Sequence, residues 1–162
     1  MIAPCGMNCG SCLGYMRFKN HCPGCRVNDD KKPASCKQCI IINCDHLRET
    51  ASKFCYECPK YPCPRLKRLD KRYRTRYDTS FFDNLTMIKE KGIDHFLAFE
   101  TERRACPVCG STLCVHRTVC FVCGSSPRND KPCDECASGY PGQLGKGDKV
   151  TADNEAVSIE NK

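Results

Sequence analysis

Residues 106–110 read Cys-Pro-Val-Cys-Gly, and residues 120–124 repeat the pattern as Cys-Phe-Val-Cys-Gly. Two cysteines in a C-x2-C pair can turn both sulfurs toward one metal ion, and two such pairs complete a tetrahedral site of four thiolates. The glycine after each second cysteine permits the turn that aims backbone amides at the sulfurs. The repeat is therefore typical of a zinc ribbon. Rubredoxin-type iron uses similar knuckles that usually lie much farther apart, so zinc is favoured. The predicted ligands are Cys106, Cys109, Cys120 and Cys123.

Cysteines at this spacing run through most of the chain. The 162 residues include 18 cysteines, which form seven C-x2-C pairs, and this content exceeds the level that marks a disulfide or metal scaffold. The first residues have neither the basic start nor the apolar core of a signal peptide, and no apolar run is long enough to span a bilayer. We therefore expect a soluble cytoplasmic protein without a membrane partner, in which the thiols stay reduced and bind metal.

The first 63 residues carry eleven of these cysteines, and all eleven are predicted metal ligands. Eleven cannot be divided into four-cysteine sites without a remainder. One ligand can instead be a histidine, with His21 and His46 as candidates; two metals can share bridging thiolates; or one site can have three cysteines and an open position. The eleven are Cys5, Cys9, Cys12, Cys22, Cys25, Cys36, Cys39, Cys44, Cys55, Cys58 and Cys63.

An iron–sulfur cluster in this region is the alternative to zinc. Cys5, Cys9 and Cys12 have the spacing of the radical-SAM cluster motif, but that enzyme class needs a long (β/α) barrel, and no strand–helix alternation follows. The sequence contains no Gly-rich phosphate loop and no Ser/His/Asp pattern. We therefore expect a binding protein rather than an enzyme, with an electron-transfer or redox protein as the alternative.

The same region carries a set of linked motifs. Residues 3–12 read Ala-Pro-Cys-Gly-Met-Asn-Cys-x2-Cys, residues 22–26 read Cys-x-Gly-Cys-Arg, and residues 36–44 read Cys-x2-Cys-x4-Cys. Residues 55–63 then read Cys-x2-Cys-x2-Tyr-Pro-Cys. With these motifs the first 65 or so residues resemble the cysteine-rich family known as domain of unknown function 3795. The resemblance implies metal binding in a prokaryotic cytoplasm and no particular activity.

Four further candidate ligands lie between the two knuckles or after them: Cys114, His116, Cys133 and Cys136. They can form a second site of three thiolates and one imidazole, interleaved with the ribbon as in a RING cross-brace, although the gap between Cys109 and Cys114 is shorter than RING domains use. Alternatively, Cys114 packs inside the ribbon, His116 lies on the surface, and the last two cysteines form a separate knuckle.

Residues 64–104 contain no cysteine and are predicted to be helical. Leu66, Leu69, Tyr73 and Tyr77 recur at helical spacing, and Gly92 marks a helix end before a third helix. Basic residues of the first helix form a candidate face for nucleic acid or another partner: Arg65, Arg68, Arg72 and Arg76. The alternative is a solvated face that balances the thiolates, since four zinc–thiolate sites would bring the formal charge of +7 to −1.

Together these patterns predict a small metal-stabilised α+β protein with few regular strands. We expect a Cys-rich zinc-knuckle module (1–63), a helical connector (64–104), a zinc-ribbon-like module (105–137) and a disordered tail (138–162). Apart from cysteine, the chain has few apolar residues and no Trp, so metal binding must supply much of the folding free energy. The predicted function is that of a protein holding several zinc ions and binding a protein or nucleic-acid partner.

Overall fold

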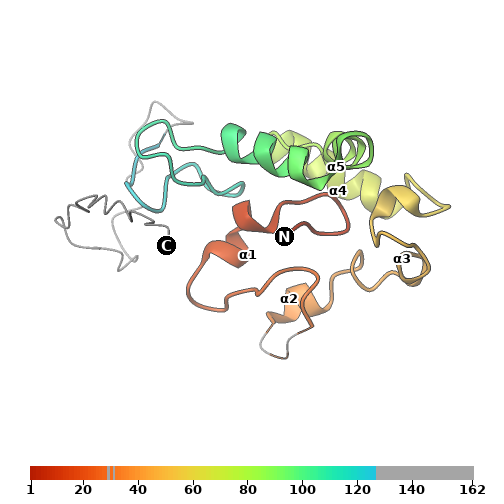
Figure 1. Ribbon diagram of the computed structural model, residues 1–162. Helices are drawn as coiled ribbons and strands as arrows, with labels where there is room; N and C mark the ends of the chain where they lie inside the picture. The colour runs from red at the N-terminus through yellow and green to blue at the C-terminus, as the bar shows by residue number, and fades with distance from the viewer. Residues whose placement is uncertain (29, 31, 127–162) are drawn as a thin grey trace, which may run out of the picture.

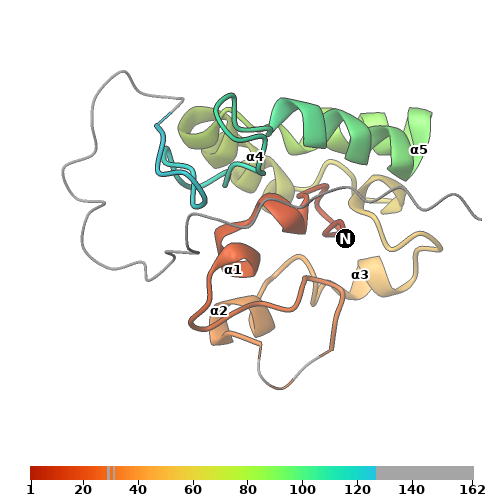
Figure 2. The ribbon, with the colours of Figure 1, turned by 60° about the vertical axis from the view of Figure 1, so that its left-hand side comes forward.

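The computed structural model describes residues 1–28, 30 and 32–126. Two long helices form one layer, and the short helices and loops of the N-terminal region lie beneath it (Figures 1 and 2). In chain order the helical elements are the short 3-10 turn η1 (Cys9–Ser11), α1 (Leu13–Met16), α2 (Ala34–Lys37), α3 (Asp45–Arg48), the 3-10 turn η2 (Cys55–Glu57), α4 (Pro64–Tyr77) and α5 (Phe81–Arg103).

Helix α4 spans the predicted apolar stripe from Leu66 to Tyr77. Pro64 occupies the first turn, where its missing N–H costs nothing. Leu66 is fully buried, and the rest of the predicted stripe is partly buried and packs against the core. The helix ends at Asp78, which has a left-handed backbone conformation. The predicted apolar face of α4 is thus the face that meets the protein.

Helix α5 is two helical segments joined at a break. Ser80 caps its N-terminus by accepting a hydrogen bond from the backbone N–H of Asp83 at 3.1 Å. Gly92 has φ 86° and ψ 169°, a conformation that is essentially restricted to glycine. Phe81 and Leu85 before the break, and Phe96 after it, are buried. The predicted helix end at Gly92 and the third helix beyond it are therefore both present.

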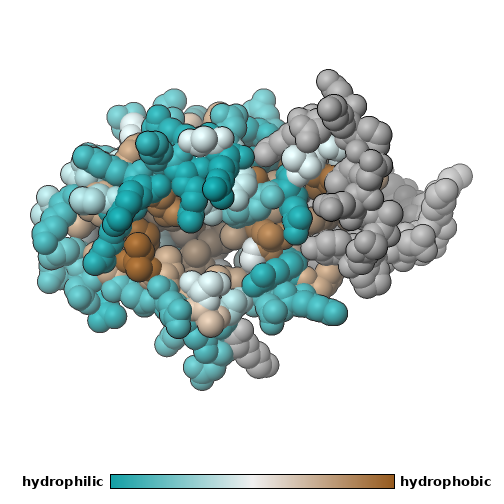
Figure 3. All heavy atoms as spheres, turned by 180° about the vertical axis from the view of Figure 1, so that it is seen from behind, coloured by the Kyte–Doolittle hydropathy of each residue, from teal (hydrophilic) through white to brown (hydrophobic). Residues whose placement is uncertain are grey.

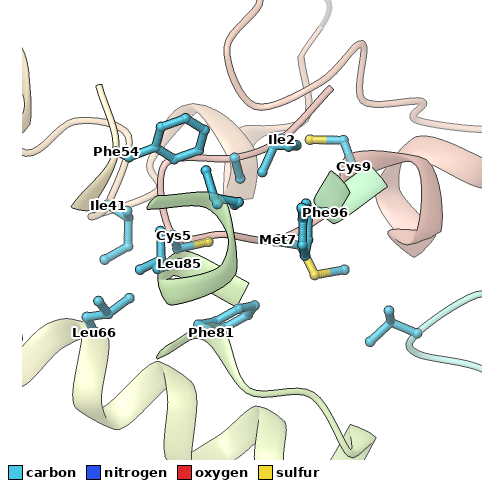
Figure 4. Packing of buried hydrophobic residues seen from close by; sticks show 13 residues of the cluster. Ile2, Cys5, Met7, Cys9, Ile41, Phe54, Leu66, Phe81, Leu85 and Phe96 are labelled. Atoms are coloured by element: carbon cyan, nitrogen blue, oxygen red, sulfur yellow. The ribbon is translucent and has the colours of Figure 1, made fainter. Parts of the chain in front are cut away.

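One core joins the N-terminal region to the helices. Its buried side chains come from the first nine residues, the loops before α3 and η2, and the inner faces of α4 and α5 (Figure 4). Val115, from the segment after α5, belongs to the same cluster. The Asn84 side chain donates a buried hydrogen bond to the carbonyl of Gly6 at 2.9 Å. Three of the four predicted regions therefore share a core.

The expected α+β class is wrong for this part of the chain, which is mostly helical and has no sheet. The β-pairing of the described residues consists of isolated bridges between Ile2 and Asn8 and between Ala105 and Thr112. The knuckles explain why no sheet forms in the described residues. Their closely spaced cysteines, prolines and glycines turn the backbone before two strands can pair over several residues. No helix in the described ranges has both the length and the apolar character needed to cross a membrane.

Candidate metal centres

The four cysteines of the ribbon motif come together in space. Their four sulfur atoms all lie within 4.8 Å of one another: those of Cys106, Cys109, Cys120 and Cys123. Across the two knuckles, the Cys106–Cys123 and Cys109–Cys120 sulfur pairs are both 3.7 Å apart. Sulfurs bound at ~2.3 Å to a tetrahedral ion lie ~3.8 Å from one another. The group therefore has the dimensions of a four-thiolate metal site and could hold a metal ion.

The two knuckles reach this geometry through the same turn. Gly110 N–H donates to the Cys106 carbonyl at 2.8 Å, and Gly124 N–H donates to the Cys120 carbonyl at 3.0 Å. Both glycines have a φ of 72°, which a side chain would disfavour. The first cysteine of each knuckle is buried and the second is exposed. The sequence repeat is thus a structural repeat, with the metal-binding side of each knuckle facing the other.

Two serines contact the sulfurs, and the sequence analysis missed them. Ser111 Oγ lies 3.0 Å from the sulfur of Cys109 and 3.1 Å from that of Cys120. Ser125 Oγ lies 3.0 Å from the sulfur of Cys123 and 3.4 Å from that of Cys106. The Ser125 hydroxyl is the main reason why the pKa of Cys106 is lowered to about 6. The signal was available, because both knuckles continue from Cys-Gly into Ser.

His116 is held by the protein rather than lying free on the surface. Leu13 N–H donates to its Nδ1 at 3.3 Å, and its Nε2 lies 2.8 Å from the Tyr73 hydroxyl. Burial and the nearby Arg104 lower the pKa of His116, so the neutral form with Nε2–H donating to Tyr73 satisfies both contacts. The imidazole therefore fastens the segment after α5 to α1 and α4.

Of the remaining residues of the predicted second C-terminal site, the structure describes only Cys114. Cys114 is buried, 1% exposed, and this burial, with a smaller contribution from the neighbouring sulfur of Cys12, raises the pKa of its thiol. Cys133 and Cys136 fall outside the described residues, as does the predicted tail at 138–162.

The eleven N-terminal cysteines surround the core without forming so tight a group. Cys5 and Cys9 are part of the buried cluster (Figure 4), Cys22 is also buried, and the others are partly exposed. Within the part of the chain that the structure describes, no other set of three or more potential ligands has all its atoms within 4.8 Å. None of the sixteen cysteines described here forms a disulfide. Of the histidine candidates, His21 is exposed against the ring of Tyr15, and His46 lies in α3.

The four arginines of the predicted partner face, Arg65, Arg68, Arg72 and Arg76, are all exposed on α4. They recur at three- and four-residue spacing and so share one side of the helix. None of them forms an ion pair with another described residue, whereas their neighbour Arg74 pairs with Asp70 at 2.8 Å and with Asp83 at 3.7 Å. Seen from behind, where α4 comes forward, the upper surface is mostly hydrophilic (Figure 3).

Comparison with known families agrees with the N-terminal motifs. Residues 1–68 match the family described as "Protein of unknown function (DUF3795)". Searches of curated proteins and of solved structures found no match. The matched region ends inside α4, so the ribbon motif and the segment that joins it to α5 lie beyond it.

Proposed function

We propose that this chain, whose residues 1–68 match the DUF3795 family model, is a zinc-stabilised binding protein of a reducing cytoplasm. The observation that carries the proposal is the C-terminal group of four sulfurs, with 3.7 Å between the paired atoms of facing knuckles. Zinc is bound by four cysteines in structural sites of this kind.

A structural role suits this donor set better than a catalytic one. Catalytic zinc keeps one coordination position for water or substrate, whereas four cysteine ligands close the tetrahedron. Such a site supplies folding free energy outright, because its ligands converge only in the folded chain. The zinc would hold the two knuckles, which present Val108 and Val122 at their exposed tips.

The exposed arginines on α4 provide the binding surface in this proposal. No described carboxylate forms an ion pair with Arg65, Arg68, Arg72 or Arg76. The nearby Tyr73 and Tyr77 contact His116 and pack against the core. The expected contact is therefore with phosphates rather than with stacked bases, as in backbone-directed nucleic-acid binding.

Metal analysis of anaerobically purified protein tests the zinc proposal. Cys120→Ser should lower the zinc content by one ion per chain, since it removes a buried ligand. Val122→Ser changes an exposed neighbour in the same knuckle that contributes no ligand, and should leave the zinc content unchanged. Iron with acid-labile sulfide and a visible absorption band would instead indicate an iron–sulfur protein, and equal metal content in both variants would reject this site.

A further inference from the structure

A cavity of about 30 Å³ lies where the loop before α3, the η2 turn and the start of α4 meet. Cysteines line it from three elements. Cys44 immediately precedes α3, Cys55 opens η2 and Cys58 immediately follows it, and Cys63 is the N-cap of α4. Segments separated by up to nineteen positions in the chain thus direct four thiols to one space.

The rest of the lining makes the cavity suitable for an ion held by sulfur. Ile41, Leu47 and Leu66, which are buried, give it an apolar lining beside the four thiols. A cavity that holds one water-sized particle needs ≳10–15 Å³ of such volume. About 30 Å³ therefore leaves room for a single ion but not for an organic cofactor.

We propose that Cys44, Cys55, Cys58 and Cys63 form a second four-thiolate site that binds one divalent ion of the zinc class. The proposal rests on the proposed function only for the identity of the metal. Because only the C-terminal group has all its sulfurs within 4.8 Å in the described structure, binding here must draw the four sulfurs inward around the ion. Each thiol releases its proton as it coordinates.

Four cysteines around one apolar cavity can ionise together only if a cation balances their negative charge. Without a cation, four thiolates in this apolar space would repel one another. A bound dication reverses this balance, because a coordinated thiol is deprotonated outright.

Alkylation of the native, metal-loaded full chain tests this site. Under iodoacetamide, read residue by residue by mass spectrometry, the four cavity cysteines should be protected and should become reactive together as a chelator removes one ion. All four are only partly buried, so the fold alone would not shield them. Their rapid alkylation while Cys109 and Cys123 stay protected would overturn the second site and leave the proposed function intact.

The metal content of a pair of variants tests the site independently. Cys58→Ser should lower the metal content by one ion, whereas Lys60→Ser, an exposed change between Cys58 and Cys63, should not. Cys58→His keeps a ligand and should restore the ion if the serine variant folds poorly. Metal content that is unchanged in Cys58→Ser would reject the site.

A separate observation concerns Cys114, which lies beyond the family-matched region. Residues 11–13 and 114–116 run side by side: Val115 N–H donates to the Ser11 carbonyl at 2.8 Å, and Leu13 N–H donates to His116 Nδ1 at 3.3 Å. These two bonds hold Cys12 beside the segment that carries Cys114. In both ribbon views the segment after α5 returns toward the turn before α1 (Figures 1 and 2).

Cys22 and Cys36 approach the same place. A Cβ at Gly14 would lie 3.8 Å from the sulfur of Cys12 and 3.6 Å from the Cβ of Cys22, and Cys22 N–H donates to the Gly14 carbonyl at 2.7 Å. Cys36 lies in α2, which is found below α1 in both ribbon views (Figures 1 and 2). Helix α2 thus brings Cys36 toward the turns around α1 that carry Cys12 and Cys22.

From these contacts we infer that Cys114 is the fourth ligand of a site with Cys12, Cys22 and Cys36. With Cys114 added, the eleven N-terminal cysteines become twelve ligands, which divide into three sites of four. With the cavity site set aside, Cys5, Cys9, Cys25 and Cys39 remain as a further set of four. The metal would tie the segment after α5 to the family-matched region, beside the anchor that His116 already provides.

Cys114→Ser tests this inference in the full chain. Native mass spectrometry should show one metal ion fewer than in the wild type, and the partly exposed Cys12 and Cys36 should become reactive to iodoacetamide. Thr118→Ser, an exposed change on the same segment, should alter neither reading, and Cys114→His should restore both if the serine variant is poorly folded. An unchanged ion count with Cys12 and Cys36 still protected would overturn the inference.

Discussion

Each knuckle of the C-terminal group carries a serine whose hydroxyl contacts one sulfur of its own knuckle and one of the other. Ser111 lies against Cys109 and Cys120, and Ser125 lies against Cys123 and Cys106. A hydroxyl that donates to a sulfur stabilises the thiolate over the thiol. These serines therefore complete the site without binding metal themselves, as outer-sphere partners commonly do.

Replacing Ser125 with Ala should weaken metal binding at the C-terminal group. The Ser125 hydroxyl is the main cause of the low pKa of Cys106, about 6. Its loss raises that pKa, so protons compete more effectively and the metal should dissociate at a higher pH. Loss of an outer-sphere partner typically costs 10–100-fold in affinity, and we expect ~10-fold at neutral pH.

The measurement is a chelator competition, repeated as the pH is lowered. Ser126→Ala is the matched control, because the Ser126 hydroxyl donates to the Thr118 carbonyl at 3.4 Å rather than to a sulfur. Equal affinity and an equal pH midpoint for the Ser125 and Ser126 variants would show that the hydroxyl contacts have no influence on the metal.

At the scale of elements, the junction between α4 and α5 depends on a carboxylate from the middle of α4. Asp70 is buried, and its Oδ1 accepts hydrogen bonds from the backbone N–H groups of Phe81 at 2.7 Å and Phe82 at 3.2 Å. Its other oxygen pairs with Arg74 at 2.8 Å. The first turn of α5 is thus capped by Ser80 locally and by Asp70 across the junction.

Asp70→Ala should destabilise the protein by about 2 kcal/mol, since it leaves two N–H groups at the start of α5 without their acceptor. The free energy of unfolding in urea, measured with metal in excess, provides the value. Glu90→Ala, an exposed change on α5, should fall within about 0.5 kcal/mol of the wild type. A similar small change for Asp70→Ala would mean that the junction does not depend on this cap.

For the whole molecule, local patterns predicted the parts more reliably than their assembly. The Cys-x2-Cys-Gly repeat correctly predicted the C-terminal group, the apolar spacing from Leu66 to Tyr77 correctly predicted α4, and Gly92 correctly predicted the break in α5. The roles of Asp70 and His116 could not be predicted, because their partners lie eleven or more positions away in the chain. Grouping the N-terminal cysteines likewise requires the fold, because the spacing between cysteines in sequence does not determine which loops meet.

The surface of α4 gives a prediction that concerns the whole molecule and its partner. Reversing Arg68 and Arg72 to Glu should weaken binding to a mixed-sequence RNA or DNA probe by tenfold or more at low salt. The salt dependence of the remaining affinity should become shallower, because fewer phosphate contacts release counterions. The metal content should stay unchanged, since both side chains are exposed and neither is a metal ligand.

The matched control reverses Lys89 and Lys91, which are exposed on α5 and change the net charge equally. If both double variants lose affinity to the same degree, binding reflects net charge rather than the α4 face. If the α4 variant keeps its affinity but loses metal, the arginines serve the thiolate clusters instead.

The central claim, that this chain is held together by zinc bound entirely by cysteine, is tested most directly by X-ray absorption at the zinc edge on the anaerobically purified full chain. A single coordination shell of four sulfurs at about 2.3 Å is expected, averaged over all bound ions. A shell of nitrogen or oxygen ligands at about 2.0–2.1 Å, or purified protein that contains iron in place of zinc, would contradict it.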